Sequence, residues 1–191
     1  MSGIVGSYFN TRGSGIVAKL GTDGQVFTST GAGLSQGFEA AAGGVNTPAF
    51  EAYLSANQGV SDATWVKVAF DTEVFDSDGT YDHSSNYRYT PATAGKYFCY
   101  TGIRAGNDGA DTLSHNMLAF YKNGAAYLIN TTPTVLLNAN SATQTNFGHM
   151  LTQTLDLDDD DYVEAYVYVD TSTGSPDLIH GSFFGAYKII T

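Results

Sequence analysis

The sequence has little cysteine, little proline and little positive charge: one Cys, four Pro and eight Lys or Arg among 191 residues. A single cysteine excludes an intrachain disulfide. Cys99 lies in the apolar stretch YFCY, which favours a buried and unreactive thiol. The 19 acidic residues give a net charge of −11, and such a surface repels phosphate backbones. We therefore expect no nucleic acid partner.

Long apolar runs and helical patterns are also missing. No stretch approaches the roughly 20 apolar residues that cross a bilayer. Residues 1–20 lack the basic start and apolar run of a signal peptide. The best helical candidate, residues 38–42, is too short to stand alone. We therefore expect a soluble chain without membrane insertion, made in a cytoplasm.

Residues that favour strands are abundant, with 13 Tyr, 11 Phe and many Thr and Val. From Pro48 onward, short apolar segments alternate with turn signals, of which Asn123-Gly124 is the strongest hairpin signal. The predicted strands are 48–53, a segment with Trp65, 67–70, 73–75, 86–89, 96–103, 117–122, 125–129, 147–155, 162–170 and 182–190, with a polar loop at 105–111. Many short strands without helices predict an antiparallel sandwich of two sheets.

Residues 1–45 differ from the rest, because they hold 11 of the 22 glycines and none of the prolines. Asp23-Gly24 predicts a tight turn before a strand at 25–29, within a small hairpin that needs a surface to lie on. The segment 1–18 suits an extended arm across a partner, or else a frayed terminus. Its anchoring side chains would be Ile4, Val5, Tyr8, Phe9, Arg12, Ile16 and Val17. We expect two parts: an arm, 1–45, and a head, 46–191.

The segment 162–170 alternates between small apolar and tyrosine side chains. Its valines would enter the core, whereas Tyr162, Tyr166 and Tyr168 would form an outward patch. Patches of this kind mark subunit or partner interfaces, although tyrosine hydroxyls also tolerate plain exposure to water. We favour a subunit interface.

Several linked motifs of the head resemble the complement q-subcomponent and tumour necrosis factor (TNF) superfamily. They are PAFEAYLS at 48–55, VKVAFDTEVFD at 66–76, YDHSSNYRYTPATAGKYFCY at 81–100, LAFYKNG at 118–124, LDLDDDDYVEAYV at 155–167 and SFFGAYKI at 182–189. The resemblance implies a ten-stranded antiparallel jelly-roll sandwich that forms a tight homotrimer. We expect the subunit contacts to involve Tyr53, Tyr162, Tyr166, Tyr168, Phe183 and Tyr187.

The lead-in has a likeness of its own. LGTDGQVFTSTGAG at 20–33, followed by Phe38, resembles a repeated unit of bacteriophage tail-fibre and other virion appendage proteins. Joined to a jelly-roll head, this likeness implies a phage virion protein, assembled in the host cytoplasm.

Candidate chemistry is weak. The acidic turn offers Asp158, Asp160 and Asp161 as calcium ligands, but no calcium-loop spacing is satisfied and a solvated turn explains it. The four histidines lie far apart, and no nucleophile elbow or phosphate-binding loop is present. A catalytic group or a carboxylate pair assembled from distant residues stays open. We expect no enzyme, no cofactor and no bound metal.

These expectations lead to a trimeric capsid cement or decoration protein, which docks by its arm on the major capsid protein or another virion protein. The alternative is a tail-fibre tip or head-fibre protein that recognises a host glycan or protein receptor. The short chain and its initial methionine favour the first placement. A free binding module or cytokine-like ligand is a third, weaker possibility.

Overall fold

A computed structural model describes residues 25–28, 37–40, 46–107, 113–127, 146–172 and 174–190. The chain divides into two units, Met1–Gly43 and Gly44–Thr191. In the first, β1 (Gln25–Thr28) pairs antiparallel with β2 (Gly37–Ala40), so the strand expected at 25–29 pairs with a segment that follows it. The turn at Asp23-Gly24 lies outside the described residues. So do the arm residues Ile4, Val5, Tyr8, Phe9, Arg12, Ile16 and Val17.

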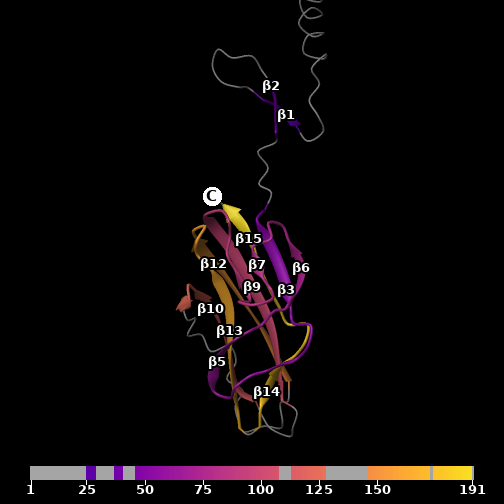
Figure 1. Ribbon diagram of the computed structural model, residues 1–191, viewed down its shortest axis with the longest axis vertical. Coiled ribbons are helices and arrows are strands. Elements are labelled where there is room, and N and C mark those ends of the chain that lie inside the picture. The colour runs from indigo at the N-terminus through magenta and orange to yellow at the C-terminus, as the bar shows by residue number, and fades with distance from the viewer. Residues whose placement is uncertain are drawn as a thin grey trace, which may run out of the picture. The chain divides into compact units, whose positions relative to one another are not determined.

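The second unit, the head, consists of two antiparallel sheets whose long strands β9, β12, β13 and β15 run along its length (Figure 1). The six-stranded sheet contains β11 (Ala125–Tyr127), β10 (Leu113–Lys122), β13 (Val163–Thr171), β8 (Arg88–Tyr89) and β7 (Tyr81–Asp82) in this order, and β5 (Thr64–Lys67) also pairs with β13. The described residues contain no helix long and apolar enough to span a membrane.

The seven-stranded sheet has β9 (Gly95–Asn107) and β15 (Phe183–Ile190) at its centre. Its strand order is β4 (Gln58–Gly59), β14 (Pro176–Leu178), β9, β15, β3 (Ala49–Tyr53) and β6 (Thr72–Asp76). A further strand, β12 (Asn146–Leu157), also pairs with β9. The chain crosses between the sheets from β9 to β10, from β11 to β12, from β12 to β13 and from β13 to β14. Repeated crossing of this kind makes an antiparallel sandwich a jelly roll.

The described part of the head has thirteen strands rather than the expected ten. The number is higher because long strands pair along separate parts of their length with several short ones. β13, for example, pairs with β5 through Tyr166–Val169 and with β8 at Val163. The higher strand count therefore reflects short strands that pair with parts of long ones. The expected two-sheet antiparallel architecture is confirmed.

Side chains that alternate inward from both sheets fill one core. The Phe50 ring stacks on the rings of Tyr81 and Tyr89 at centroid distances of 4.6 and 4.4 Å, and it meets the edge of Phe184 at 4.9 Å. The β13 valines are buried as expected, and so is Cys99, where burial raises the pKa of the thiol. The aromatic rings thus join the two sheets through one apolar layer.

Two local predictions are corrected and one is confirmed. The loop expected at 105–111 is wrong for Ala105–Asn107, because β9 continues there and pairs with β12 and β14. The strand expected at 67–70 is wrong beyond Lys67, where β5 ends, although Val68 and Phe70 remain buried. The Asn123-Gly124 hairpin is confirmed, with φ values of 53° and 75° that match a two-residue turn with positive φ at both positions.

Candidate functional site

The outer face of the seven-stranded sheet carries an aromatic patch, formed by Tyr53, Phe98, Tyr100, Phe183 and Tyr187. The strand register brings these residues together, because Phe183 pairs with Tyr53 and Tyr187 pairs with Phe98. Their neighbours along the strands, such as Ala52 and Cys99, are buried, so the patch residues point away from the core. The patch is therefore a continuous surface built from three adjacent strands.

Two glycines allow the patch rings to lie flat on the sheet. A Cβ atom on Gly102 would come within 2.5 Å of the Phe183 ring, and one on Gly185 would overlap the Tyr100 ring. The Tyr100 and Phe183 centroids are 6.3 Å apart, within the range of favourable aromatic pairs. The sequence places glycine where the rings cross the neighbouring strand.

One carboxylate lies within this apolar surface. The Tyr100 hydroxyl donates a hydrogen bond of 2.8 Å to Glu51 Oε2. Burial and this contact raise the pKa of Tyr100, so its hydroxyl remains a donor at neutral pH. The bond fixes the Tyr100 ring in the patch.

Unburied apolar surface is concentrated on the same sheet. Among the described residues, four large apolar side chains are exposed: Val74 (57%), Phe75 (46%), Met150 (59%) and Ile189 (43%). They belong to β6, β12 and β15, all strands of the seven-stranded sheet. Of the two sheets, the seven-stranded one therefore carries the large apolar side chains that the described part of the head leaves exposed.

The outer face of the six-stranded sheet is aromatic too, but its rings cover one another. The Tyr121 and Tyr166 rings stack at 3.8 Å, and Trp65 lies 5.7 Å from Tyr168. The Arg88 guanidinium lies 4.4 Å from the centroid of the Tyr162 ring, a cation–π contact. All these rings are partly buried within the chain itself.

Charged groups on this second face are paired. Lys67 Nζ lies 3.0 Å from Glu164 Oε1, and the Glu164 side chain is only 7% exposed. Burial, followed by the nearby Glu164 carboxylate, raises the pKa of Tyr166. The Lys67–Glu164 pair thus places a charged pair beside the Tyr166 ring on this face.

The residues expected at the subunit interface are divided between these faces. Tyr53, Phe183 and Tyr187 lie in the aromatic patch. Tyr162, Tyr166 and Tyr168 lie on the opposite side of the sandwich. Sequence reasoning missed Phe98 and Tyr100, although their alternation with buried neighbours in YFCY was a usable signal.

The acidic turn between β12 and β13 has a structural role at Asp161. This nearly buried carboxylate accepts hydrogen bonds from the Asp158 amide (2.7 Å) and from Asn123 Nδ2 (2.6 Å), and it lies 2.6 Å from Lys122 Nζ. Burial opposes its charge, but these contacts prevail and lower its pKa. Asn123 Oδ1 also accepts a hydrogen bond of 2.9 Å from the Tyr162 amide, so the acidic turn is linked to the β10–β11 hairpin.

The other two calcium candidates, Asp158 and Asp160, are exposed. Within the described ranges, no three His, Cys, Asp or Glu side chains are grouped to hold a metal ion. The contacts of Asp161 assign it to closing the turn.

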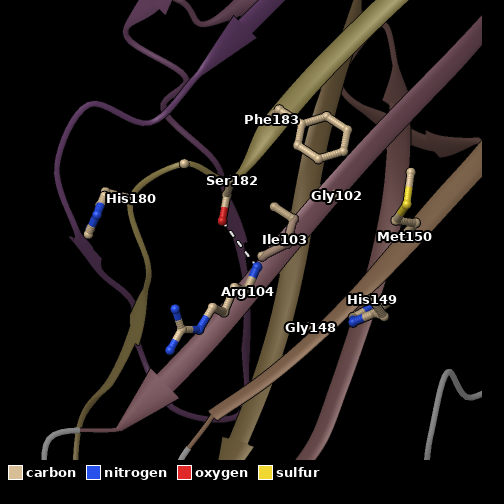
Figure 2. Close-up of a pocket in the computed structure, with 10 residues that line it drawn as sticks. Gly102, Ile103, Arg104, Gly148, His149, Met150, His180, Ser182 and Phe183 are labelled. Carbon is tan, nitrogen blue, oxygen red and sulfur yellow. Dashed lines mark hydrogen bonds between the residues drawn. The ribbon is translucent and has the colours of Figure 1, made fainter.

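A pocket of ≈310 Å³ opens beside the aromatic patch (Figure 2). Its walls include Arg104 from β9, Met150 from β12, His180 from the loop before β15, and Phe183. The dashed line in Figure 2 is a 3.1 Å hydrogen bond from the Arg104 amide to Ser182 Oγ, which holds this loop against β9. Sequence reasoning did not single out Arg104, because nothing in the sequence shows that these three segments meet.

The four histidines, which lie far apart in the sequence, have three different surroundings in the fold. His83 pairs with Glu73 at 2.7 Å and His115 with Asp170 at 3.1 Å, whereas His149 and His180 both contribute to the pocket. The ring nitrogens of His149 are buried and have no hydrogen-bond partner among the residues that the structure describes. Burial lowers the pKa of His149 to about 4, so the ring is neutral at physiological pH.

No family model and no curated protein matches the chain. Solved structures similar to it include the globular domain of zebrafish complement 1qA protein (TM-score 0.48, 12% identity, covering 74% of this chain and 96% of that chain). Others are Eiger TNF from S. frugiperda (0.46, 12%, 74% and 91%) and murine APRIL at pH 5.0 (0.47, 11%, 74% and 98%). Complement q and TNF heads are the superfamily that residues 48–190 resemble. At these scores, the jelly-roll assignment rests on the strand order and register described above.

Proposed function

We propose that the protein is a non-enzymatic structural protein that forms a homotrimer through the aromatic patch and acts as a cement or decoration protein on a phage capsid. The observation that carries the trimer is the position of the four exposed large apolar side chains, all on the seven-stranded sheet. Burying this surface between copies removes apolar area from water, the main favourable term in association.

The symmetry of a trimer constrains the interface. In a closed ring of three copies each contact joins two different surfaces, so the patch of one copy must meet another surface of its neighbour. The edge strand β6, with its exposed Val74 and Phe75, can supply that second surface. We therefore place the patch and the adjoining edges of the seven-stranded sheet toward the threefold axis. This leaves Tyr162, Tyr166 and Tyr168 outside the interface.

The virion role is supported by the sequence likeness of residues 20–33 to phage appendage proteins. Three arms tied to one trimer raise each other's effective concentration at a capsid surface. Weak contacts by single arms then add up to durable attachment. The major capsid protein, or another repeated virion protein, is the partner that such multiplicity suits.

Sedimentation of the full chain at micromolar concentration tests the trimer, and cosedimentation with capsids tests the virion role. Deletion of residues 1–20 should leave a folded trimer that no longer binds capsids. A monomeric wild-type chain would overturn the trimer. A shortened chain that still decorates capsids normally would overturn the role of the arm alone.

A second candidate role is receptor binding at the tip of a tail fibre or head fibre. The position of the pocket favours it. Phe183 and Gly102 lie at one end of the seven-stranded sheet, whereas Ala49, where the chain enters the sheet, pairs with Tyr187 toward the other end. Copies per virion separate the roles, because hundreds indicate cement and a few dozen or fewer indicate a fibre.

A further inference from the structure

We propose that the pocket beside Arg104 binds a small sugar acid, that is, a sugar ring carrying one carboxylate. The inference goes beyond the cement role and does not depend on the virion placement. It requires that the end of the seven-stranded sheet with Phe183 and Met150 stays open to a ligand in the trimer. It names the class of ligand that the second candidate role would need. Three features of the pocket carry it: an unpaired cation, a histidine held in one orientation, and an open floor beside apolar side chains.

The first feature is the charge of Arg104. Lys67, Lys96 and Lys122 each form an ion pair with a carboxylate, whereas Arg104 has none among the described residues. None of the ten lining residues is acidic, although the chain has 19 Asp and Glu. An exposed arginine in a pocket lined by no acidic residue attracts a negative group.

The Arg104 guanidinium is held by one hydrogen bond and keeps further N–H donors for a ligand. One of its Nη nitrogens donates to Asn146 Oδ1 at 3.1 Å. Nε and the other Nη have no partner within the described part of the chain. A planar guanidinium binds a carboxylate through two parallel hydrogen bonds. The second hydrogen of the Nη that contacts Asn146 can form such a pair with Nε or with the other Nη, which suits a carboxylate better than a neutral hydroxyl.

The second feature is His180, whose ring is held by the side chain of Asn57. Asn57 Oδ1 accepts a hydrogen bond of 2.9 Å from the His180 backbone amide, and it lies 3.2 Å from the ring Nδ1. Because an amide oxygen only accepts, Nδ1 carries a hydrogen in this contact. Nε2 is the ring nitrogen left to face a ligand hydroxyl. Arg104 and His180 lie on the same side of the pocket in Figure 2.

The third feature is the floor, where Gly102 and Gly148 contribute no side chains. The Phe183 ring lies over Gly102, and the exposed Met150 side chain borders the opposite side. Apolar walls of this kind pack against the C–H face of a sugar ring, which a bare anion lacks. A volume of ≈310 Å³ is at the lower end for small-ligand sites, which suits a ligand of one or two rings.

The net charge of the whole chain limits how much negative charge the ligand can carry. A net charge of −11 repels anions, and repulsion grows with their charge. Screening within about 8 Å at physiological salt lets the nearby Arg104 prevail for a singly charged group. A single carboxylate is therefore favoured over a doubly charged phosphate.

Calorimetric titration of the full-length protein tests the proposal with a matched pair of sugars. D-glucuronic acid and D-glucose share the ring and differ by the carboxylate, and acetate supplies the carboxylate without the ring. We expect glucuronate to bind at least tenfold more tightly than either glucose or acetate. The variant Arg104→Gln should lower the affinity for glucuronate at least tenfold.

A second variant, Gly148→Leu, guards against an indirect effect of losing the charge. A Cβ at Gly148 meets only the Ile103 carbonyl oxygen, at 3.7 Å, so a side chain fits on the sheet while filling the pocket. We expect it to abolish glucuronate binding. Lys96→Gln, which removes a cation elsewhere on β9, should leave binding unchanged.

Equal affinity for glucose and glucuronate, equal affinity for acetate and glucuronate, or undiminished binding by Arg104→Gln would each overturn the proposal. Sedimentation of the same samples separates this failure from that of the proposed function. A trimer that binds no glucuronate overturns the ligand site alone. A trimer that dissociates in Arg104→Gln shows that an acidic side chain of a neighbouring copy fills the pocket, which also overturns it.

Discussion

The two outer faces of the sandwich are both rich in half-buried aromatic rings, yet they differ in the side chains beside those rings. On the six-stranded sheet, Tyr121 stacks on Tyr166, Arg88 covers Tyr162 and Lys67 pairs with Glu164. The seven-stranded sheet instead carries Val74, Phe75, Met150 and Ile189, the large apolar side chains that are exposed among the described residues. A count of outward aromatic residues therefore does not distinguish the faces, whereas exposed apolar side chains do.

The largest effect is expected from charges placed in the aromatic patch. The double variant Phe98→Asp, Tyr187→Asp puts two carboxylates where the rings now lie 5.5 Å apart. Burying unpaired charges in an interface is strongly unfavourable. The dissociation constant of the trimer should rise at least about a hundredfold. Analytical ultracentrifugation over a dilution series measures it, and an intact trimer at low micromolar concentration would contradict the proposed interface.

Lys67→Met tests whether the six-stranded face depends on its internal ion pair. The change leaves the Glu164 carboxylate, which is 7% exposed, without its cation. Since Lys67 is itself partly exposed, we expect a loss of about 2–3 kcal/mol in the free energy of unfolding. Lys96→Met is the matched control, because Lys96 and Asp156 are both exposed and should contribute less than about 1 kcal/mol. Urea denaturation of the two variants gives the difference, and equal losses would remove the contrast between the faces.

Gly185→Ala asks whether the patch requires its rings to lie flat. The added methyl group would overlap the Tyr100 ring, which must then move from its bond with Glu51. We expect a loss of about 1–2 kcal/mol in unfolding free energy, together with weaker association. Gly148→Ala is the matched control, because its methyl group meets no atom closer than 3.7 Å. Thermal unfolding and sedimentation of both variants measure the stability and the association. Equal losses in Gly185→Ala and Gly148→Ala would mean that Tyr100 has no fixed place in the patch.

Acid should destabilise the seven-stranded sheet through His149. The folded ring titrates at a pKa of about 4 because of burial, against an ordinary value of 6.5. The unfolded chain therefore binds more protons as the pH falls from about 6.5 to 4, and the free energy of unfolding decreases over this window. With allowance for partial exposure we expect about 1 kcal/mol.

The His149 effect is isolated by comparing the wild type with His149→Leu at pH 7.5 and pH 4.5. Carboxylates titrate in both proteins, so the difference between their pH dependences reports on the imidazole. Identical pH dependence would show that the ring gains a proton in the folded state as readily as in the unfolded chain.

The smallest effect on association is expected on the six-stranded face. Tyr166→Ser and Tyr168→Ser remove rings that pack on Tyr121 and Trp65 within the same chain. They should cost about 1 kcal/mol of folding stability each and leave the trimer unchanged. Sedimentation of the double variant measures this. Weakened association would instead place this face in the interface, as the sequence suggested.

The sequence was sufficient for the architecture because local signals and the two-residue period agree. The β13 alternation and the Asn123-Gly124 turn each specify a face or a hairpin without distant information. It was insufficient where pairing is non-local. β9 extends through Ala105–Asn107 only because β12 and β14 lie beside it, and no local signal shows that.

The same limit applies to the candidate site. The six residues expected at the subunit interface remain a prediction, and the sequence could not show that they divide between two faces. That division follows from the strand register, which pairs Phe183 with Tyr53 and places Tyr168 opposite Trp65 on the other sheet. Arg104 was missed because the pocket joins β9, β12 and a loop from distant parts of the chain.

The tie between Asn123 and the acidic turn has a consequence for the chemical ageing of the protein. Asn-Gly pairs deamidate readily when the glycine amide nitrogen attacks the asparagine side chain. Here both ends of that side chain are engaged, its nitrogen by Asp161 and its oxygen by the Tyr162 amide. The folded head thus shields its most labile amide. An aspartate formed there would set a new negative charge against Asp161, so the damage would loosen the turn that had prevented it.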